Sequence, residues 1–370
     1  MATIAPEDLQ ALKDAVHRLL GDQSGEAQVR ATMDTASGYD PALWKQLAEM
    51  GVVGLVVDEE FGGGGAGPVE LEAVMEEAGA ALLCSPLLAS GVLAAELLKA
   101  LGDRAAATRL LPGIAAGTSI ATVALTGERG LWTADGVDLT AEVGGGGWAV
   151  SGAARYVIHG QNADVLLALA RAPDGLAVFE VDPKASGVEI EALPAFDHTL
   201  RLAAVRFTGA AGRRLDAAGP VWPAVQQAID LALVALAGEQ AGGARRCLEF
   251  TVDYAKNRIQ FGRAIGSFQA IKHMAADLLL ESESAISAAR NAAARLAEGA
   301  PDAPAAISLA AFACADAFSQ TTATSIQMHG GIAFTWTHPG HLYLRRARAD
   351  AQLFGTPAYH RERYIQQLGG

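Results

Sequence analysis

Positively charged side chains gather in two stretches of the C-terminal part of this 370-residue chain. Arginine and lysine pair readily with phosphate oxygens, so these stretches could bind a phosphate or diphosphate group. A solvated helix face, on which each cation pairs with a carboxylate, would show the same pattern, and composition does not separate the two interpretations. The first stretch holds Arg245, Arg246, Lys256, Arg258 and Arg263, and the second holds Arg345, Arg346, Arg348, Arg361 and Arg363.

A glycine pattern of the form GxGxxG at residues 62–67 matches the fingerprint of dinucleotide-binding folds. There, glycine lets the backbone approach a pyrophosphate at a helix N-terminus. The pattern follows Val52–Val57, which we expect to be a strand. Three carboxylates, Asp58–Glu60, stand between that strand and the glycines, where a diphosphate would be repelled. We therefore interpret the glycines as a flexible loop.

The remaining reactive side chains favour no other chemistry. His329 precedes Gly330 and Gly331, a pair typical of a helix C-cap, where histidine more often caps than catalyses. The histidines do not follow HxxxH or HxH spacing, and neither GxSxG nor SxxK occurs. Metal sites and acyl-enzyme chemistry are therefore unsupported.

Composition excludes several classes of protein. With 51% hydrophobic residues the chain is too apolar to be disordered, and its net charge of −13 disfavours nucleic-acid binding. Its apolar runs are shorter than the roughly 20 residues of a membrane span, and no secretion signal opens the chain. The three distant cysteines, Cys84, Cys247 and Cys314, form no disulfide or metal pattern. We expect a soluble, cytoplasmic protein.

The elements that must position these residues fall into three blocks. Helical spacing begins behind Pro6 and again at Asp40-Pro41, an N-cap followed by a proline, and it stops at Gly51. Two further helical segments are expected at 71–79 and 88–101. The first block is therefore helical.

Short, often alternating segments follow from about Thr118, separated by glycine, proline and aspartate. The run of glycines at 144–147 is typical of a hairpin loop. Seven strands are expected, at Ser119–Thr126, Gly136–Val143, Trp148–Ile158, Ala163–Ala170, Gly175–Val181, Val188–Leu193 and Leu200–Phe207.

Long alanine-rich helical stretches return from about Val221, at 223–260, 267–298 and 302–329, followed by a shorter terminal piece. Large segregated blocks favour an α+β architecture over alternating βαβ units. We expect an N-terminal helical domain over 1–117, a middle β domain over 118–215 and a C-terminal helical domain over 216–370.

Two segments resemble the C-terminal signatures of the acyl-CoA dehydrogenase family. Residues 253–269, DYAKNRIQFGRAIGSFQ, are similar to its R-x-x-F-G…F-Q signature. Residues 327–334, QMHGGIAF, followed by His338-Pro339 and Arg345-Arg346, resemble the second. The block order and the length agree, so the resemblance covers essentially the whole chain. It is strongest over 230–364 and weakest over 120–170.

This resemblance implies an FAD enzyme whose middle domain is an antiparallel β-barrel or sandwich and whose C-terminal domain is a helical bundle. Such an enzyme forms a trans double bond between Cα and Cβ of an acyl-CoA thioester. A carboxylate removes the α-proton, flavin N5 takes a hydride from Cβ, and the electrons leave through an electron-transfer flavoprotein. Family members are usually tetramers in which each flavin lies across a dimer interface.

The resemblance also assigns cofactor-binding residues. Six of them would serve the flavin of a neighbouring subunit, since they meet its diphosphate, pack against the dinucleotide or hold its adenosine end. These six are Arg258, Phe261, Gln269, Gln327, Gly330 and Gly331. Thr356 would serve the flavin of its own subunit.

The base of the family reaction is missing from its usual positions. Many members carry it as the Glu of a Tyr-Glu-Gly-Thr segment, and Phe354 stands there in this chain. Others place it 29 residues before the conserved Phe, where this chain has Ala232. Neither side chain can accept a proton. Glu239, two helical turns after Ala232, is a candidate substitute base, although an ordinary carboxylate satisfied by arginine or backbone is the favoured interpretation.

The middle block departs from the family as well. Ala124–Glu128 keeps only a trace of the usual Thr-Glu-Pro segment, and Tyr156–Ile158 replaces Trp-Ile-Thr and so loses a hydroxyl group near flavin N5.

Two hypotheses stay open. The chain is either a self-sufficient FAD dehydrogenase with a non-standard base, or the catalytically degenerate half of an α2β2 hetero-oligomer that completes a partner's flavin site. The second arrangement occurs in a family branch that acts on steroid-derived or other bulky acyl-CoAs. A non-enzymatic scaffold is disfavoured because Arg258, Gln327 and the Gly330-Gly331 pair are retained.

Overall fold

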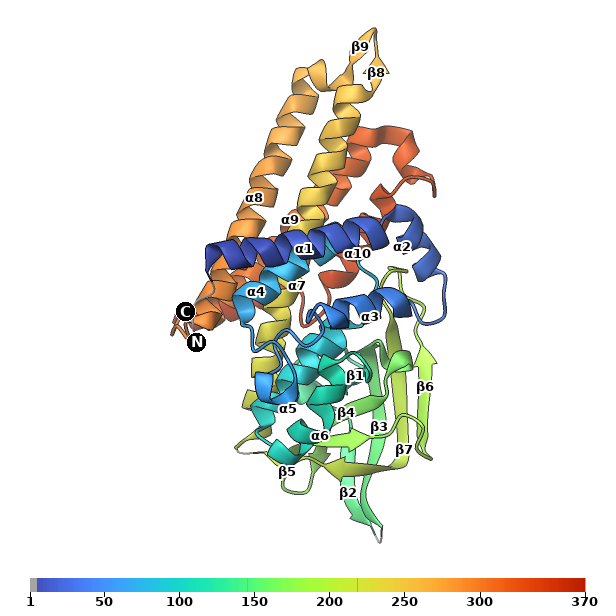
Figure 1. Ribbon diagram of the computed structural model, residues 1–370, viewed down its shortest axis with the longest axis vertical. Helices are drawn as coiled ribbons and strands as arrows, with labels where there is room; N and C mark the ends of the chain where they lie inside the picture. Colours follow the sequence, from blue (N-terminus) through green and yellow to red (C-terminus); the bar gives the residue numbers. More distant parts are fainter. Residues whose placement is uncertain (1–4, 145, 218, 370) are drawn as a thin grey trace.

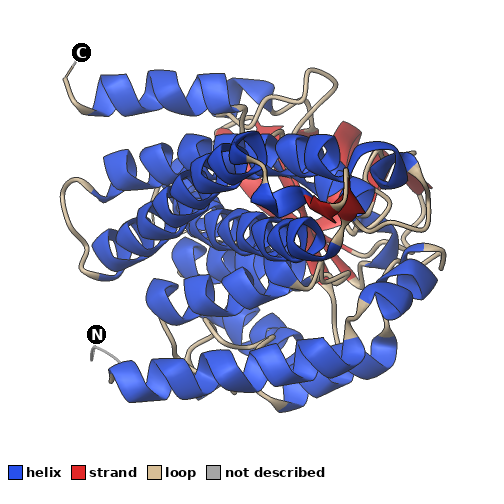
Figure 2. Ribbon diagram, turned by 90° about the horizontal axis from the view of Figure 1, so that it is seen from above, coloured by secondary structure: helices blue, strands red, loops and turns tan. Residues whose placement is uncertain are grey.

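The computed structural model describes residues 5–144, 146–217 and 219–369. Helices, strands and again helices follow one another along the chain, as the sequence predicts (Figure 1). Seen from above, the helices cover most of the strands (Figure 2). The fold is thus the expected α+β arrangement of two helical regions and a middle β unit.

The first helical region begins where the sequence predicts. Pro6 occupies the first turn of α1, and the Asp40 carboxylate accepts a 2.8 Å hydrogen bond from the Ala42 N–H and so caps α3. The elements are α1 (Pro6–Gln23), α2 (Glu26–Met33), α3 (Pro41–Glu49), η1 (Glu59–Phe61), α4 (Pro68–Ala80), the π-helix η2 (Leu88–Ala94), α5 (Ala95–Leu101) and α6 (Arg104–Ala115).

The prediction of a strand at Val52–Val57 is wrong, because this segment forms consecutive buried turns. A short apolar run fits a buried strand and a buried turn equally well. The glycine loop that follows is an ordered loop, since the N–H groups of Gly63, Gly64 and Gly65 donate to backbone carbonyls of residues 54–58. A Cβ on Gly63 would lie 2.1 Å from the Val57 carbonyl oxygen. These glycines therefore allow close packing within the chain, and the segment contains no βαβ unit.

All seven expected strands are present in the middle unit. They are β1 (Ala121–Ala124), β2 (Thr140–Gly144), β3 (Gly147–Ile158), β4 (Val165–Ala172), β5 (Gly175–Val181), β6 (Val188–Ala192) and β7 (Leu202–Arg214). Pairing runs from β4 through β2, β3, β7 and β5 back to β4, so the sheet closes on itself. Most pairs are antiparallel as expected, but β4 pairs in parallel with β1 and β2. The predicted glycine hairpin joins Gly144 to Gly147, and Gly145 lies outside the described residues.

The second helical region contains α7 (Val221–Asn257), α8 (Gln269–Ala297), α9 (Ala303–His329), α10 (Gly340–Asp350) and α11 (Pro357–Gln367). The first of these helices ends three residues earlier than predicted, because a small hairpin, β8 (Ile259–Gln260) and β9 (Arg263–Ala264), joins it to α8. This hairpin forms the tip of the molecule farthest from the middle unit (Figure 1).

Helix α7 is the central element of the structure. In the described part of the chain it alone is long and apolar enough to cross a membrane, but 67% of its most apolar window is buried inside the protein. It contacts α4, α5, α8, α9 and α10. One hydrophobic core extends through all three regions, for example from Leu20 through Leu167 to Leu233. The domain boundaries expected at 117 and 215 therefore stay a prediction.

Glycines let α4 and α7 approach to backbone contact. A Cβ on Gly79 would lie 1.8 Å from the Glu239 carbonyl oxygen, and a Cβ on Gly242 would lie 1.8 Å from that of Glu76. Because both obstacles are helix backbone, neither can move aside without separating the helices.

We expect Gly242→Ala to lower the free energy of unfolding by about 1–3 kcal/mol, since the added methyl group forces α4 and α7 apart. Urea unfolding followed by circular dichroism measures the change. Gly21→Ala is the matched control: it also adds a methyl group within a helix, but the new Cβ meets nothing within 4 Å. It should leave stability unchanged or raise it by up to about 1 kcal/mol. Equal stability of the two variants would contradict the proposed contact.

Candidate functional site

A cavity of about 630 Å³ lies between the middle unit and helices α10 and α11. Its wall carries four aromatic rings, those of Trp132, Tyr156, Phe196 and Tyr359. Thr356 also lines it, and the Thr356 hydroxyl caps α11 by accepting a 3.2 Å hydrogen bond from the Tyr359 N–H. A planar, largely apolar molecule fits this lining.

Both positions where the family carries its base are apolar and buried. The Phe354 side chain is 1% exposed, and its ring packs edge-on against Trp132 with 4.9 Å between ring centroids. Ala232 lies in the interior of α7 with no exposed surface. Neither position presents a proton acceptor to a cavity.

Glu239, the candidate substitute base, is 6% exposed on α7 and bonds the guanidinium group of Arg346. Arg346 also donates to Asp197 at 2.8 Å and to Thr199 at 2.7 Å. Glu239 is thus paired with an arginine, as expected for an ordinary structural carboxylate, which was the favoured interpretation. The cavity beside it measures about 20 Å³, which is room for one water molecule and too little for an acyl thioester.

The charged side chains of the first basic stretch divide between the two interpretations. Arg246 and Lys256 pair with the exposed carboxylates of Glu249 and Asp253, in the manner of a solvated helix face. Arg245 pairs instead with the buried carboxylates of Glu76 and Glu77. Arg258 and Arg263 are exposed and, among the described residues, pair with no acidic side chain. The Arg263 guanidinium lies 4.0 Å above the Phe268 ring.

The second stretch divides in the same way. Arg346, Arg361 and Arg363 form ion pairs with Asp197, Glu239, Asp316 and Asp230. Arg345 instead lies over the rings of Phe196 and Trp336, and the exposed Arg348 lines the 630 Å³ cavity. Most of the predicted phosphate-binding cations therefore form ion pairs within the chain.

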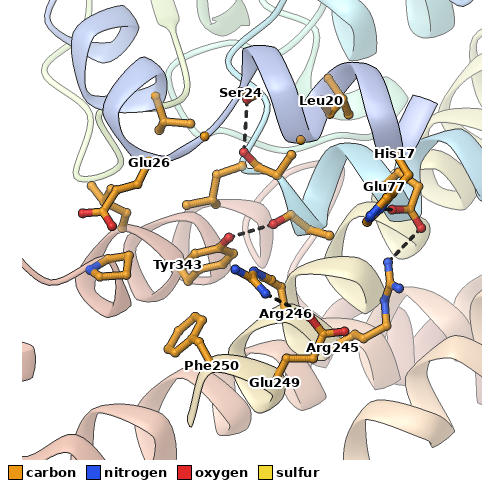
Figure 3. A pocket seen from close by; sticks show the side chains of 18 residues that line it. His17, Leu20, Ser24, Glu26, Glu77, Arg245, Arg246, Glu249, Phe250 and Tyr343 are labelled. Carbon is orange, nitrogen blue, oxygen red and sulfur yellow. Dashed lines mark hydrogen bonds and ion pairs between the residues drawn. The ribbon is translucent and has the colours of Figure 1, made fainter. Parts of the chain in front are cut away.

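A second cavity, of about 380 Å³, shows this use of arginine directly (Figure 3). Arg245 and His17 both bond the buried Glu77 carboxylate, at 2.8 and 2.7 Å, and the Tyr343 hydroxyl donates to the Ala80 carbonyl. Arg246 pairs with Glu249 at its edge. The charged side chains that line this cavity pair with one another, and none of the predicted cofactor-binding residues lines it.

Three predicted cofactor residues, Arg258, Phe261 and Gln269, lie at the exposed tip formed by β8, β9 and the start of α8 (Figure 1). The Phe261 ring is 91% exposed, and its backbone is left-handed, with φ at 52°. Such exposure of an aromatic ring is costly in water and typical of a surface that meets another molecule.

The second signature lies beside the first. His329 ends α9 as predicted, and its ring stacks on Tyr254 of α7 at 4.4 Å. The following glycines, Gly330 and Gly331, are exposed, and a Cβ on either would meet no atom of the chain within 4 Å. A positive φ of 66° explains Gly330, but nothing within the described chain requires glycine at 331.

The residues of the two signatures fit one end of FAD. An unpaired guanidinium group suits a diphosphate, and bare glycine backbone suits a closely approaching adenosine. The aromatic and apolar lining of the 630 Å³ cavity suits a flavin ring. At the positions where the family bonds the ring, however, Ile158 is apolar and the buried Thr126 hydroxyl already donates to the Arg155 carbonyl at 2.5 Å. Arg258, Phe261 and Gln269 are exposed at the tip, Gln327, Gly330 and Gly331 are exposed at the end of α9, and Thr356 lines the 630 Å³ cavity. Within the described chain these residues do not form one site.

Sequence reasoning did not identify the aromatic wall of the large cavity or the carboxyl groups around Arg346. Trp132, Tyr156 and Phe196 come from three separate loops and strands, so no spacing links them. The Arg345-Arg346 pair of the second signature was the available signal for the buried cluster, but nothing in it distinguishes an exposed arginine from a buried one.

Comparison with known proteins identifies the family of the chain. The family model described as acyl-CoA dehydrogenase, C-terminal domain, matches residues 222–369, and the corresponding N-terminal domain matches residues 6–118. Acyl-CoA dehydrogenase IpdE2 of Mycobacterium tuberculosis is 36% identical over 357 residues, which cover 95% of this chain and 94% of that protein.

Two solved structures are similar over almost their whole length. The ChsE4–ChsE5 complex from Mycobacterium tuberculosis matches with a TM-score of 0.89 and 28% identity, covering 100% of this chain and 99% of that one. A variant of the Tcur3481–Tcur3483 steroid ACAD matches with a TM-score of 0.87 and 28% identity, covering 98% of each chain. This chain belongs to the acyl-CoA dehydrogenase family.

Proposed function

We propose that this chain takes part in the α,β-dehydrogenation of an acyl-CoA thioester as one subunit of a hetero-oligomer, in which it completes the FAD site of a catalytic partner. One observation carries the proposal. The six residues that the family offers to a neighbour's flavin are all exposed, whereas Phe354 and Ala232, at the base positions, are buried and apolar.

In this assembly the chain binds and orients the cofactor of its partner. When bound, FAD accepts the hydride that leaves Cβ of the substrate. Arg258 neutralises the diphosphate, the Gly330-Gly331 backbone allows close contact with the adenosine, and Phe261 excludes water from the dinucleotide. The partner contributes the carboxylate base and the acyl-thioester site.

The relatives support a hetero-oligomer and a bulky substrate. One similar structure is a complex of two different proteins, and the other is named a steroid ACAD. We therefore favour a steroid-derived or similarly bulky acyl-CoA, with electrons passing to an electron-transfer flavoprotein. The free, buried cysteines suit the reducing cytoplasm expected from the sequence.

A second candidate is a self-sufficient homo-oligomeric dehydrogenase. The observation that favours it is the 630 Å³ cavity with Thr356 on its wall, where the subunit's own flavin would lie. Glu239 would then have to leave Arg346 and act as the base. The buried ion pair opposes this, because separating it leaves two uncompensated charges inside the protein.

Flavin content separates the two candidates. The chain is purified alone and after co-expression with an acyl-CoA dehydrogenase subunit encoded beside its gene, and visible flavin absorbance is compared with protein concentration. We expect a colourless chain on its own and one flavin per heterodimer in the complex. A yellow isolated chain that acyl-CoA reduces would overturn the proposal.

We expect Arg258→Ala to weaken FAD retention by the complex by about tenfold or more, because a charge-assisted hydrogen bond contributes about 1.5–3 kcal/mol. Equilibrium dialysis of the complex against free FAD measures the change. Arg295→Ala is the control, since Arg295 pairs with Glu298 and Asp302 on a distant part of the surface. Similar retention in both variants would show that Arg258 does not bind the diphosphate.

We expect Phe354→Glu to produce no dehydrogenase activity in the isolated chain, although it restores a carboxylate at the family's base position. The buried carboxylate should instead lower stability by about 3 kcal/mol or more, since it replaces a ring packed on Trp132. Phe354→Leu, which keeps the position apolar, is the control for packing. Acyl-CoA-dependent flavin reduction by the Glu variant alone would favour a self-sufficient enzyme.

A further inference from the structure

One buried guanidinium group faces three buried carboxyl groups where the middle unit meets the second helical region. Arg346 and Asp350 come from α10, Glu239 from α7, and Asp197 from the loop before β7. All four side chains are buried. Three ionised carboxylates around one cation would leave two uncompensated negative charges in the protein interior, which is strongly unfavourable.

The hydrogen bonds of Arg346 show which carboxyl group is left over. Its nitrogens donate to Asp197, Glu239 and Thr199, and to the Leu83 carbonyl. None of them bonds Asp350, whose Oδ2 atom is buried and has no hydrogen-bond partner among the described residues. Asp350 is thus the carboxyl group of the cluster that Arg346 does not bond.

The groups that face Asp350 favour its neutral form. Burial raises the pKa of Asp350 well above its ordinary value, and the charges of Glu239 and Asp197 raise it further, against the opposing effect of Arg346. On the α11 side lies His360, whose pKa is lowered to about 4 by burial and by Arg363, so its ring is neutral at physiological pH.

A cavity of about 10 Å³ separates Asp350 from two other polar side chains, Gln240 of α7 and His360 of α11. Each has buried polar atoms with no partner among the described residues, namely Gln240 Oε1 and both ring nitrogens of His360. The cavity can hold about one water molecule, which needs two to four polar partners. Three buried side chains therefore supply the partners that such a water requires.

We infer that Asp350 is a buried proton-binding site: its carboxyl group keeps a proton taken from solvent and shares it, through one water molecule, with Gln240 and His360. Arg346 then remains bonded to Asp197 and Glu239. The inference concerns the charge balance of this cluster and does not depend on the proposed role in flavin binding.

The proton has a structural consequence for the large cavity. Arg346 holds Asp197 and Thr199, and residues 193–197 form one wall of the 630 Å³ cavity. An ionised Asp350 would compete with Asp197 and Glu239 for the one guanidinium group. Because folding raises the pKa of Asp350, its contribution to stability is complete at low pH and is lost as the pH rises through the folded-state value.

Infrared spectroscopy of the full chain tests the proton directly. With isotope-labelled aspartate at neutral pH, we expect a label-sensitive carbonyl band of a protonated carboxyl group, and Asp350→Asn should remove it. Absence of that band from the wild-type spectrum, or its persistence in the variant, would overturn the inference. The wild-type measurement decides the question even where the variant folds poorly.

The pH dependence of unfolding provides an independent test. Between about pH 6 and about pH 9, the folding equilibrium constant of the wild type should fall by up to about tenfold per pH unit relative to Asp350→Asn, which cannot ionise. Asp302→Asn, which removes an exposed carboxylate paired with Arg295, should follow the wild-type profile. Parallel profiles of wild type and Asp350→Asn would reject a proton on Asp350.

Discussion

The backbone contact between α4 and α7 is the constraint on which the rest of the structure depends. Glycines at 79 and 242 let each helix touch the carbonyl groups of the other, so the first and second helical regions share one core. Helix α7 then extends beyond that core to the exposed tip. The same helix therefore fixes the position of Glu239 inside the protein and of Arg258 about five turns farther along.

This geometry separates two surfaces that a flavin site needs together. The tip offers a guanidinium group and an exposed ring, and bare glycine backbone follows α9, whereas the 630 Å³ cavity with Thr356 lies beside the middle unit. Arg258 directly follows the 37-residue helix α7, whereas Thr356 caps α11. Under the proposed function, a complete site would combine surfaces of two subunits, and this chain would keep one of those surfaces without the other.

Much of the fold was predictable because local signals carried it. The N-cap at Asp40, the strand spacing of the middle unit and the stop at Gly330 all coincide with observed element ends. The strand prediction for Val52–Val57 was wrong because the segment is apolar through burial in turns and not through strand pairing. The site was harder to predict from the sequence. The ion pair of Glu239 with Arg346 joins residues 107 positions apart, and no local pattern specifies such a contact. The cofactor assignments of Arg258 to Thr356 remain predictions.

Under the proposed function, the exposed apolar side chains of the two signatures affect how the cell produces this protein. Phe261 and Phe334 are 91% and 81% exposed, and Ile259 beside the first is more than half exposed. Synthesis in excess of a partner would leave these side chains in water, where they promote self-association. Balanced production of the two chains, as from one transcript, would keep such surfaces covered from the moment of folding.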